Sequence, residues 1–172
     1  KIEDDAAKLY THSKDILEFL EDLGVIVGKK SNRAFIPQLI LNNTKYSLDF
    51  LRGFIDTDGG LTFKKGSRKK TNYPVIAVVS ASRKLIKDIR IILDELSITY
   101  NEQKVVKNNN FGYFTHYRLD ICGKDNLNKW IEFIGSNNPK HLTKIQVWKK
   151  FGYCPSYTTY AERLKVLKEG SC

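Results

Sequence analysis

The stretch that decides the fold is Phe50-Leu51-Arg52-Gly53-Phe54-Ile55-Asp56-Thr57-Asp58-Gly59, which predicts a helix ending in two carboxylates and a glycine. Acidic side chains at the partially negative C-terminus of a helix are unfavourable by about 0.3–1 kcal/mol, so this ending indicates a nearby cation, such as a metal ion. Gly53 within the helix costs about 1 kcal/mol relative to alanine, but it lets another backbone approach closely. We therefore expect a tightly packed helix that delivers a carboxylate at its end.

The two carboxylates cannot easily share one ligand. Asp56 and Asp58 are two positions apart, which turns them about 200° from each other on a helix. One of them should be structural or cap the helix locally, and the other should point out of the helix end. Hard oxygen donors suit Mg²⁺, and two such ions near a phosphodiester can activate water. Taken alone, Asp-Thr-Asp-Gly is also typical of a simple helix stop and turn.

Composition narrows the function classes. A chain of 172 residues is long enough for one domain with its own core. Its formal net charge of +10, from 29 Lys+Arg against 19 Asp+Glu, favours a polyanionic partner, foremost nucleic acid. A basic protein without such a partner is the alternative. No apolar run approaches the roughly 18 residues that span a membrane, so we expect no membrane partner.

The cysteines indicate the compartment. Cys122, Cys154 and Cys172 are odd in number and far apart. Such spacing favours reduced thiols over a disulfide framework or a zinc site, and predicts an intracellular location.

Hydrophobic periodicity sets the expected elements. Residues 13–25 predict a helix capped by Ser13 and Gly24. From residue 46 the order helix, hairpin, helix, hairpin, helix predicts an α+β fold, with one antiparallel sheet and helices on one face. The other face of the sheet must meet solvent or a ligand. After the motif helix, the expected segments are strands 61–65 and 73–80, helix 82–96, hairpin arms 101–106 and 111–121, helices 126–134 and 140–150, and a last short helix at 161–168.

The chain divides at residue 45 in this interpretation. Residues 1–45 form an N-terminal helical or linker segment, and residues 46–172 form the main domain with its C-terminal helices. The pattern of residues 20–25 is weakly repeated at 93–98. That echo makes the first segment a candidate remnant of an upstream unit, although amphipathic helices often resemble one another.

Residues 51–59 match the nine-residue LAGLIDADG motif at every chemically restrictive position, with Arg52 in place of the usual alanine. The flanks are similar too: Ile36-Pro37 before the motif, Tyr73-Pro74-Val75-Ile76 on the second strand, and Ser82-Arg83-Lys84-Leu85-Ile86 opening the next helix. The chain thus resembles the LAGLIDADG homing endonucleases, DNA-cutting enzymes of mobile introns and inteins. The resemblance implies an αββαββα unit whose saddle-shaped sheet covers the DNA major groove.

The resemblance also implies an activity. It is the hydrolysis of both strands of double-stranded DNA at a long recognition site, with Mg²⁺ or Mn²⁺ held at Asp58 and Gly59. One motif implies a homodimer that meets through the motif helix, with Leu51, Gly53 and Phe54 at the interface. The alternatives are a non-cleaving nucleic-acid-binding protein on the same scaffold, such as an RNA maturase or a transcriptional regulator, and a homodimeric structural domain that binds no nucleic acid.

Family active sites often place a basic residue on or just after the last strand. That position falls near Cys122, so the resemblance points to Lys124 as a catalytic residue, with Lys104 and Lys107 as rivals; all three are also explicable as surface lysines. Basic hairpins can contact the major groove and phosphates, or can be simply solvated. The expected DNA-binding residues are Lys64, Lys65, Arg68, Lys69, Lys70, Ser80, Lys104, Lys107, Asn109, His116 and Arg118.

Overall fold

A computed structural model of the chain describes residues 2–3, 6–7, 12–26, 32–65, 72–109 and 112–169. Its helices are α1 (Lys14–Asp22), α2 (Gln38–Leu41), α3 (Thr44–Thr57), α4 (Arg83–Glu95), α5 (Lys124–Phe133), α6 (Pro139–Phe151) and α7 (Tyr160–Glu169). Its strands are β1 (Ile2–Glu3), β2 (Ala6–Ala7), β3 (Gly60–Lys64), β4 (Tyr73–Ser80), β5 (Asn101–Asn109) and β6 (Gly112–Cys122). In these residues no helix combines the length and the apolarity needed to cross a bilayer.

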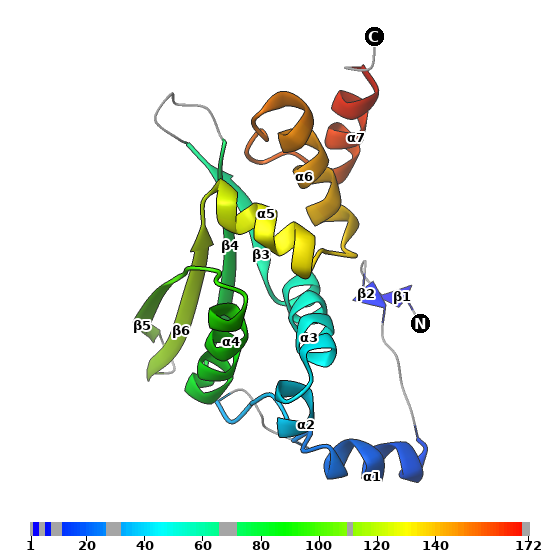
Figure 1. Cartoon of the computed structure of the whole chain (residues 1–172), viewed down its shortest axis with the longest axis vertical. Coiled ribbons are helices and arrows are strands. Elements are labelled where there is room, and N and C mark those ends of the chain that lie inside the picture. The colour runs from blue at the N-terminus through cyan, green and yellow to red at the C-terminus, as the bar shows by residue number, and fades with distance from the viewer. Residues whose placement is uncertain are drawn as a thin grey trace.

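The predicted α+β fold is confirmed. Strands β3-β4-β6-β5 form one antiparallel sheet, and α3, α4 and α5 lie on the same side of it (Figure 1). Each pair keeps one register along its length, from Gly60 opposite Ala77 to Asn109 opposite Gly112. Side chains therefore alternate strictly between the helix-covered face and the open face.

Local capping fixes where the central helices begin. The Asn43 side chain accepts a hydrogen bond from the Tyr46 amide at 3.1 Å, and the Ser82 hydroxyl accepts one from the Leu85 amide at 3.2 Å. These are the short polar side chains preferred at a helix N-terminus. The second hairpin is longer than predicted, because β5 continues through the polar residues up to Asn109. Neither α2 nor the short β1–β2 pair was predicted.

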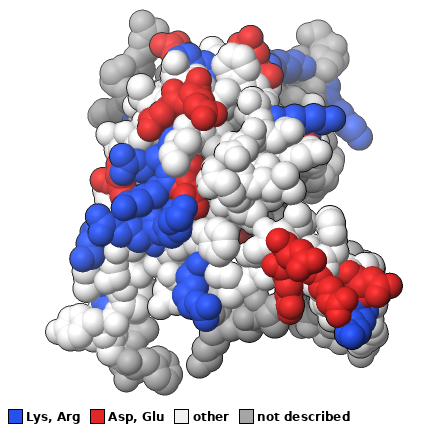
Figure 2. Space-filling model, turned by 60° about the horizontal axis from the view of Figure 1, so that its bottom comes forward, with Lys and Arg blue, Asp and Glu red and all other residues white. Residues whose placement is uncertain are grey.

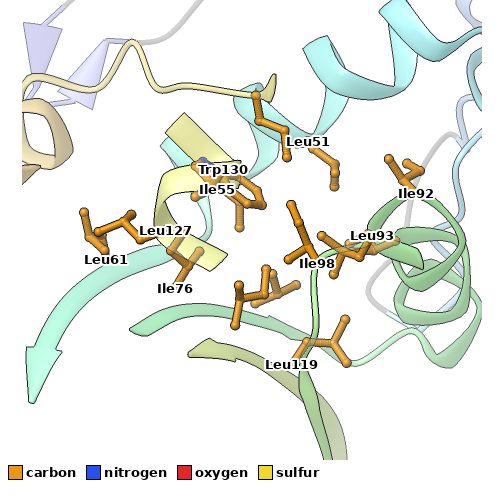
Figure 3. Close-up of a cluster of buried hydrophobic side chains, with 14 of the residues drawn as sticks. Leu51, Ile55, Leu61, Ile76, Ile92, Leu93, Ile98, Leu119, Leu127 and Trp130 are labelled. Carbon is orange, nitrogen blue, oxygen red and sulfur yellow. The ribbon is translucent and has the colours of Figure 1, made fainter. Parts of the chain in front are cut away.

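The core lies between the sheet and the helices. Leu51 and Ile55 of α3 meet Trp130 of α5, Ile76 of β4 and Leu119 of β6 (Figure 3). Each of these side chains is at most 3% exposed, so α3 is the central element of the packing.

The segment before α3 belongs to the same core. Ile36 is 1% exposed, and its amide donates to the buried Asp88 carboxylate of α4 at 3.0 Å. Asp88 also pairs with Lys84, and the Ser82 hydroxyl donates to the Ala34 carbonyl. Because a buried carboxylate needs such partners, these contacts attach the chain before α3 to α4.

Candidate metal and nucleic-acid site

Asp58 is the C-cap residue of α3. Its backbone N–H donates to the Phe54 carbonyl at 2.9 Å, which closes the last turn of the helix. Its side chain is exposed, and within the described part of the chain the carboxylate makes no hydrogen bond and no ion pair. A free carboxylate beside the partial negative charge of a helix end is electrostatically unfavourable unless a cation joins it.

Gly59 is required by packing. A Cβ at this position would lie 2.8 Å from the Cα of Ile55 and 2.6 Å from its Cδ1, closer than side-chain contacts allow. Glycine therefore lets the chain turn tightly from α3 into β3 and keeps Asp58 at the edge of the sheet. Packing alone therefore explains a glycine at position 59, the residue predicted to bind the metal together with Asp58.

Asp56, in contrast, has a full set of partners. Its carboxylate accepts hydrogen bonds from the Ser136 hydroxyl at 2.5 Å and the Asn137 amide at 2.6 Å, and its backbone carbonyl accepts one from the Asn138 side chain at 2.7 Å. His141 Nδ1 lies 3.5 Å from the carboxylate. The loop between α5 and α6 thus holds the end of α3.

His141 is buried among mostly cationic neighbours. Burial lowers the pKa of its imidazole, and the positive charges of Lys144 and Arg163 lower it further. The Asp56 carboxylate opposes this shift without reversing it. His141 is therefore neutral at neutral pH, and its contact with Asp56 does not depend on a second full charge.

A cavity of about 640 Å³ runs along the outer side of α3. Asp58 and Ser80 lie in its wall with Phe50 and Phe54, whose rings stack with centroids 6.0 Å apart. The structure thus brings Ser80 to the same space as Asp58. The Ser80 hydroxyl accepts a hydrogen bond from the Ser82 amide at 3.0 Å, which orients it at the end of β4.

The predicted interface residues separate into two kinds. Gly53 is exposed, and among the described residues a Cβ there would meet no atom within 4 Å outside its own helix, while Phe54 is half-buried. Leu51 is 0% exposed and packs inward against the core, so its assignment to the interface was wrong. The free face of α3 is the face that carries Gly53.

The prediction that Lys124 acts beside Asp58 was also wrong. Lys124 starts α5 immediately after Gly123, whose amide donates to the Pro74 carbonyl at 3.0 Å. Ser80, next to Asp58, is at the opposite end of β4. Five residues of strand separate Val75, opposite Cys122, from Ser80, which is about 17 Å.

The open face of the sheet carries part of the predicted DNA-binding set. Register places Lys64, Lys107, His116 and Arg118 on this face, with Arg118 opposite Val79, a residue that lines the same cavity as Asp58. Arg118 donates to Asp120 at 2.9 Å, and this bond raises the pKa of its guanidinium.

The remaining members of that set differ in position. Lys104 is opposite Tyr117, on the helix-covered face, so the register does not support its predicted contact with DNA on the open face. Lys65 follows β3 and is exposed. Asn109 lies at the end of β5, opposite Gly112. Arg68, Lys69 and Lys70 lie outside the described residues.

Charge is unevenly distributed over the surface. Figure 2 shows acidic side chains gathered at the lower right, where α1 lies in Figure 1, apart from a basic group on the left. Helix α1 carries Asp15, Glu18, Glu21 and Asp22. The basic excess of the chain therefore lies outside α1, on the body that contains the sheet.

The possible metal ligands at the end of α3 are few. The described residues contain no cluster of three or more His, Cys, Asp or Glu side chains that could enclose one. Asp58 stands alone, with the Gly59 carbonyl next to it. This set fits a hard divalent ion that takes one or two carboxylates and completes its shell with water and phosphate oxygens, as Mg²⁺ does.

Sequence reasoning missed the loop that holds Asp56. Ser136, Asn137, Asn138 and His141 are about 80 positions from Asp56, and no local pattern links them. The available signal was Asn138-Pro139, because Asn is favoured as an N-cap and Pro as the first helical residue. That signal marks the start of α6 but not its partner.

The sheet, the helix layer and the motif at the end of α3 define a class. Residues 45–135 match the LAGLIDADG-like domain, and the chain belongs to the LAGLIDADG family. Membership indicates a homing-endonuclease or related nucleic-acid-binding function. The family's nucleases typically use divalent metals, while some members are maturases.

Three curated relatives are similar over most of this chain. The replication factor C small subunit of Methanocaldococcus jannaschii is 31% identical over 138 residues, which cover 80% of this chain and 7% of that protein. The replicative DNA helicase DnaB of Rhodothermus marinus is 27% identical, covering 70% and 12%. A probable translation initiation factor IF-2 of M. jannaschii is 29% identical, covering 68% and 10%. The matching segment is thus a small part of each relative.

Proposed function

We propose that this protein is a metal-dependent, site-specific endonuclease that hydrolyses double-stranded DNA as a homodimer inside the cell. The observation that carries the proposal is the free Asp58 carboxylate, exposed at the end of α3 where the open face of the sheet begins. A carboxylate that has no partner among the residues described by the structure, on a chain of net charge +10, fits a metal ion shared with a phosphodiester.

In this proposal Asp58 and the Gly59 carbonyl hold Mg²⁺ or Mn²⁺. The bound ion would activate water and stabilise the leaving oxygen. The residues around Asp56 fix the helix end that presents Asp58, so the carboxylate needs no rearrangement when DNA arrives. Ser80, in the same cavity wall, would orient a water molecule.

One basic residue is better placed than Lys124 to stand near the cut phosphate. Arg118 lies opposite Val79, beside the cavity that contains Asp58. We propose that Arg118 compensates phosphate charge there.

DNA would lie along the open face of the sheet. Lys64, Lys107, His116 and Arg118 face it, and Arg68, Lys69 and Lys70 extend the proposed contact into the first hairpin. Arginine and lysine neutralise phosphates and read guanine edges, whereas the net charge raises the rate of encounter. The division of these residues between base contacts and phosphate contacts depends on the DNA sequence that the protein recognises.

A second copy would pack on the free face of α3. Gly53 has open space around it and Phe54 is half-buried, so a partner helix can approach closely there. Two copies bring two Asp58 carboxylates to two strands. Of residues 1–45, those before Ala34 would then serve as a linker or as the remnant of an upstream unit, because Ile36 belongs to the core of the domain. A segment shared by otherwise different proteins, at 7–12% of their length, supports an origin in an inserted element.

The test is selection from a randomised duplex library. We expect the protein to cut a specific subset with Mg²⁺ and to cut none with EDTA. Asp58→Asn should bind the selected duplex with unchanged affinity and leave it intact. Binding that survives EDTA while no sequence is ever cut identifies the non-cleaving maturase or regulator instead. No binding even at low salt, where phosphate contacts are strongest, excludes both.

A further inference from the structure

A second cavity lies at the far end of β3 from Asp58. Its volume is about 460 Å³, and Lys64, Lys65 and Lys144 line it together with the hydroxyl-bearing residues Ser156 and Thr158. None of the residues that line it is acidic. Figure 1 shows α6 and α7 beside this end of the first hairpin, on the opposite side of the molecule from α1.

The walls of this cavity are firmly held. The Lys144 ammonium of α6 donates to the Leu61 carbonyl of β3 at 2.6 Å, and the rings of Phe63 and Trp148 lie 5.9 Å apart. These contacts attach α6 to β3. Lys144 therefore lies in a packed interface between α6 and β3, and the cavity wall is not formed by a solvated turn alone.

Arg163 of α7 lies behind the cavity with its charge unpaired. It is 3% exposed and donates to the Thr143 hydroxyl at 3.0 Å and to the carbonyls of Thr158 and Lys140. Within the described ranges no carboxylate lies within 4 Å of its guanidinium. The neighbouring Glu162 carboxylate is instead occupied by the Thr159 amide and hydroxyl, at 2.7 and 2.9 Å.

Buried charges in proteins are normally paired, because desolvation is costly. Here the buried guanidinium of Arg163 lies near the half-buried ammonium of Lys144. Burial lowers the pKa of Lys144, and the positive charge of Arg163 lowers it further. Two further lysines join them at the rim. The described residues around these cations supply hydrogen-bond acceptors but no carboxylate within 4 Å of the guanidinium, so an anion is the missing component.

We propose that this cavity binds a phosphate group, held by Lys64, Lys65 and Lys144 with the hydroxyl of Ser156, because the Thr158 hydroxyl already donates to the Pro155 carbonyl at 3.1 Å. Lysine provides point charges and hydroxyls provide donors, which together suit the several oxygens of a phosphate. The phosphate comes either from the DNA backbone or from a free anion. The DNA source rests on the proposed function.

The position of the cavity suits a backbone phosphate away from the cut site. The strand from Gly60 to Lys64 separates it from Asp58, which is roughly 17 Å along the sheet. A duplex that lies along the open face would pass this point several nucleotides from the scissile bond. The C-terminal helices would then extend the contact beyond the sheet.

Inorganic phosphate is the first probe. We compare thermal unfolding of the wild type in phosphate and in chloride of equal ionic strength. Ligand binding to the folded state should raise the midpoint by a few degrees, about 2–4 °C at saturating phosphate. Lys65→Gln and Lys144→Met should lose at least half of this rise. Lys149→Gln removes the same charge from an exposed site on α6 outside the cavity and should keep it.

The second probe is DNA binding across a salt series. If the backbone occupies the cavity, Lys65→Gln should lower the slope of log affinity against log salt by about 1, and Lys149→Gln should not. A phosphate-specific rise in midpoint without this slope change assigns the site to a free anion. A wild type that binds no DNA but keeps the rise contradicts only the proposed function. Equal midpoints in phosphate and chloride for the wild type overturn the phosphate site.

Discussion

The two aspartates at the end of α3 have opposite environments. Asp56 accepts two hydrogen bonds on its carboxylate, and the His141 ring lies 3.5 Å away. Asp58, two residues later, is exposed, and its carboxylate makes no hydrogen bond or ion pair within the described part of the chain. The 200° turn between them, about what an α-helix gives two residues, directs one inward and the other outward.

This difference assigns a structural role to Asp56 and the proposed metal-binding role to Asp58. Asp56 attaches the helix end to the loop before α6, so its charge is used within the protein. Asp58 keeps its oxygens available, and the helix dipole works against it. The same substitution at the two positions should therefore change stability with opposite signs, and only one of them should change catalysis directly.

The largest expected effect is at Asp58. Asp58→Asn should lower single-turnover cleavage of the selected duplex by roughly 10³-fold, because the metal ligand is lost. The free energy of unfolding should rise by about 0.3–1 kcal/mol, since a negative charge leaves the helix C-terminus. Urea titration and quenched-flow cleavage measure the two quantities.

Asp49→Asn is the matched control, because Asp49 is an exposed carboxylate on the same helix that pairs with Arg52 at 2.5 Å. Its cleavage rate should stay near that of the wild type. If Asp58→Asn cuts as fast as this control, Asp58 is not the metal ligand.

The next effect is at Asp56. Asp56→Asn should lower the free energy of unfolding by about 2–3 kcal/mol, because an amide cannot accept from both the Ser136 hydroxyl and the Asn137 amide without opposing a donor. Urea unfolding of Asp56→Asn and Asp58→Asn side by side tests the contrast. Ser136→Ala should give a smaller loss of about 1 kcal/mol. Equal changes in the free energy of unfolding for Asp56→Asn and Asp58→Asn would contradict the structural role of Asp56.

Much of this arrangement was readable from the sequence. Ser82 marked a helix start, the strand pattern after Gly60 marked the sheet, and Asp58 followed from the motif. These signals are local: a cap, a periodicity and a glycine need only a few neighbouring residues.

The errors arose where position depends on distant pairing. Lys124 was misplaced because the register of β6 on β4, which separates Cys122 from Ser80, is not encoded locally. The face of Lys104 could not be predicted because its neighbours Val105 and Val106 are both apolar, so no alternation shows which face is covered. The partners of Asp56 were invisible for the same reason of distance along the chain.

The free face of α3 gives a smaller effect that extends the comparison from charge to packing. Gly53→Ala should raise the free energy of unfolding of the monomer by up to about 1 kcal/mol, since among the described residues the added Cβ meets no atom within 4 Å outside its own helix and alanine favours helix. The dissociation constant of the dimer should rise about tenfold or more, which is about 1.4 kcal/mol, because two backbones can no longer meet closely. Sedimentation equilibrium reports it, with exposed Lys45→Ala of the same helix as control. A monomer at every concentration, or an unchanged constant, contradicts the interface.

The smallest effect concerns pH, and it tests whether His141 supports Asp56 as a neutral group. Burial and the charges of Lys144 and Arg163 lower the pKa of folded His141, while the unfolded ring titrates at about 6.5. The unfolded state therefore binds the proton more tightly, so the contribution is complete above about pH 6.5 and is lost as pH falls from there towards the folded value. Between pH 7 and 5 the unfolding midpoint should fall, by at most about 3 °C from this residue. His141→Gln should flatten that part of the profile, whereas exposed His12 offers the control His12→Gln, which should leave it unchanged. A steeper loss in His141→Gln, or a profile in which acid stabilises the wild type, would mean that His141 is protonated in the fold and that Asp56 is held by an ion pair.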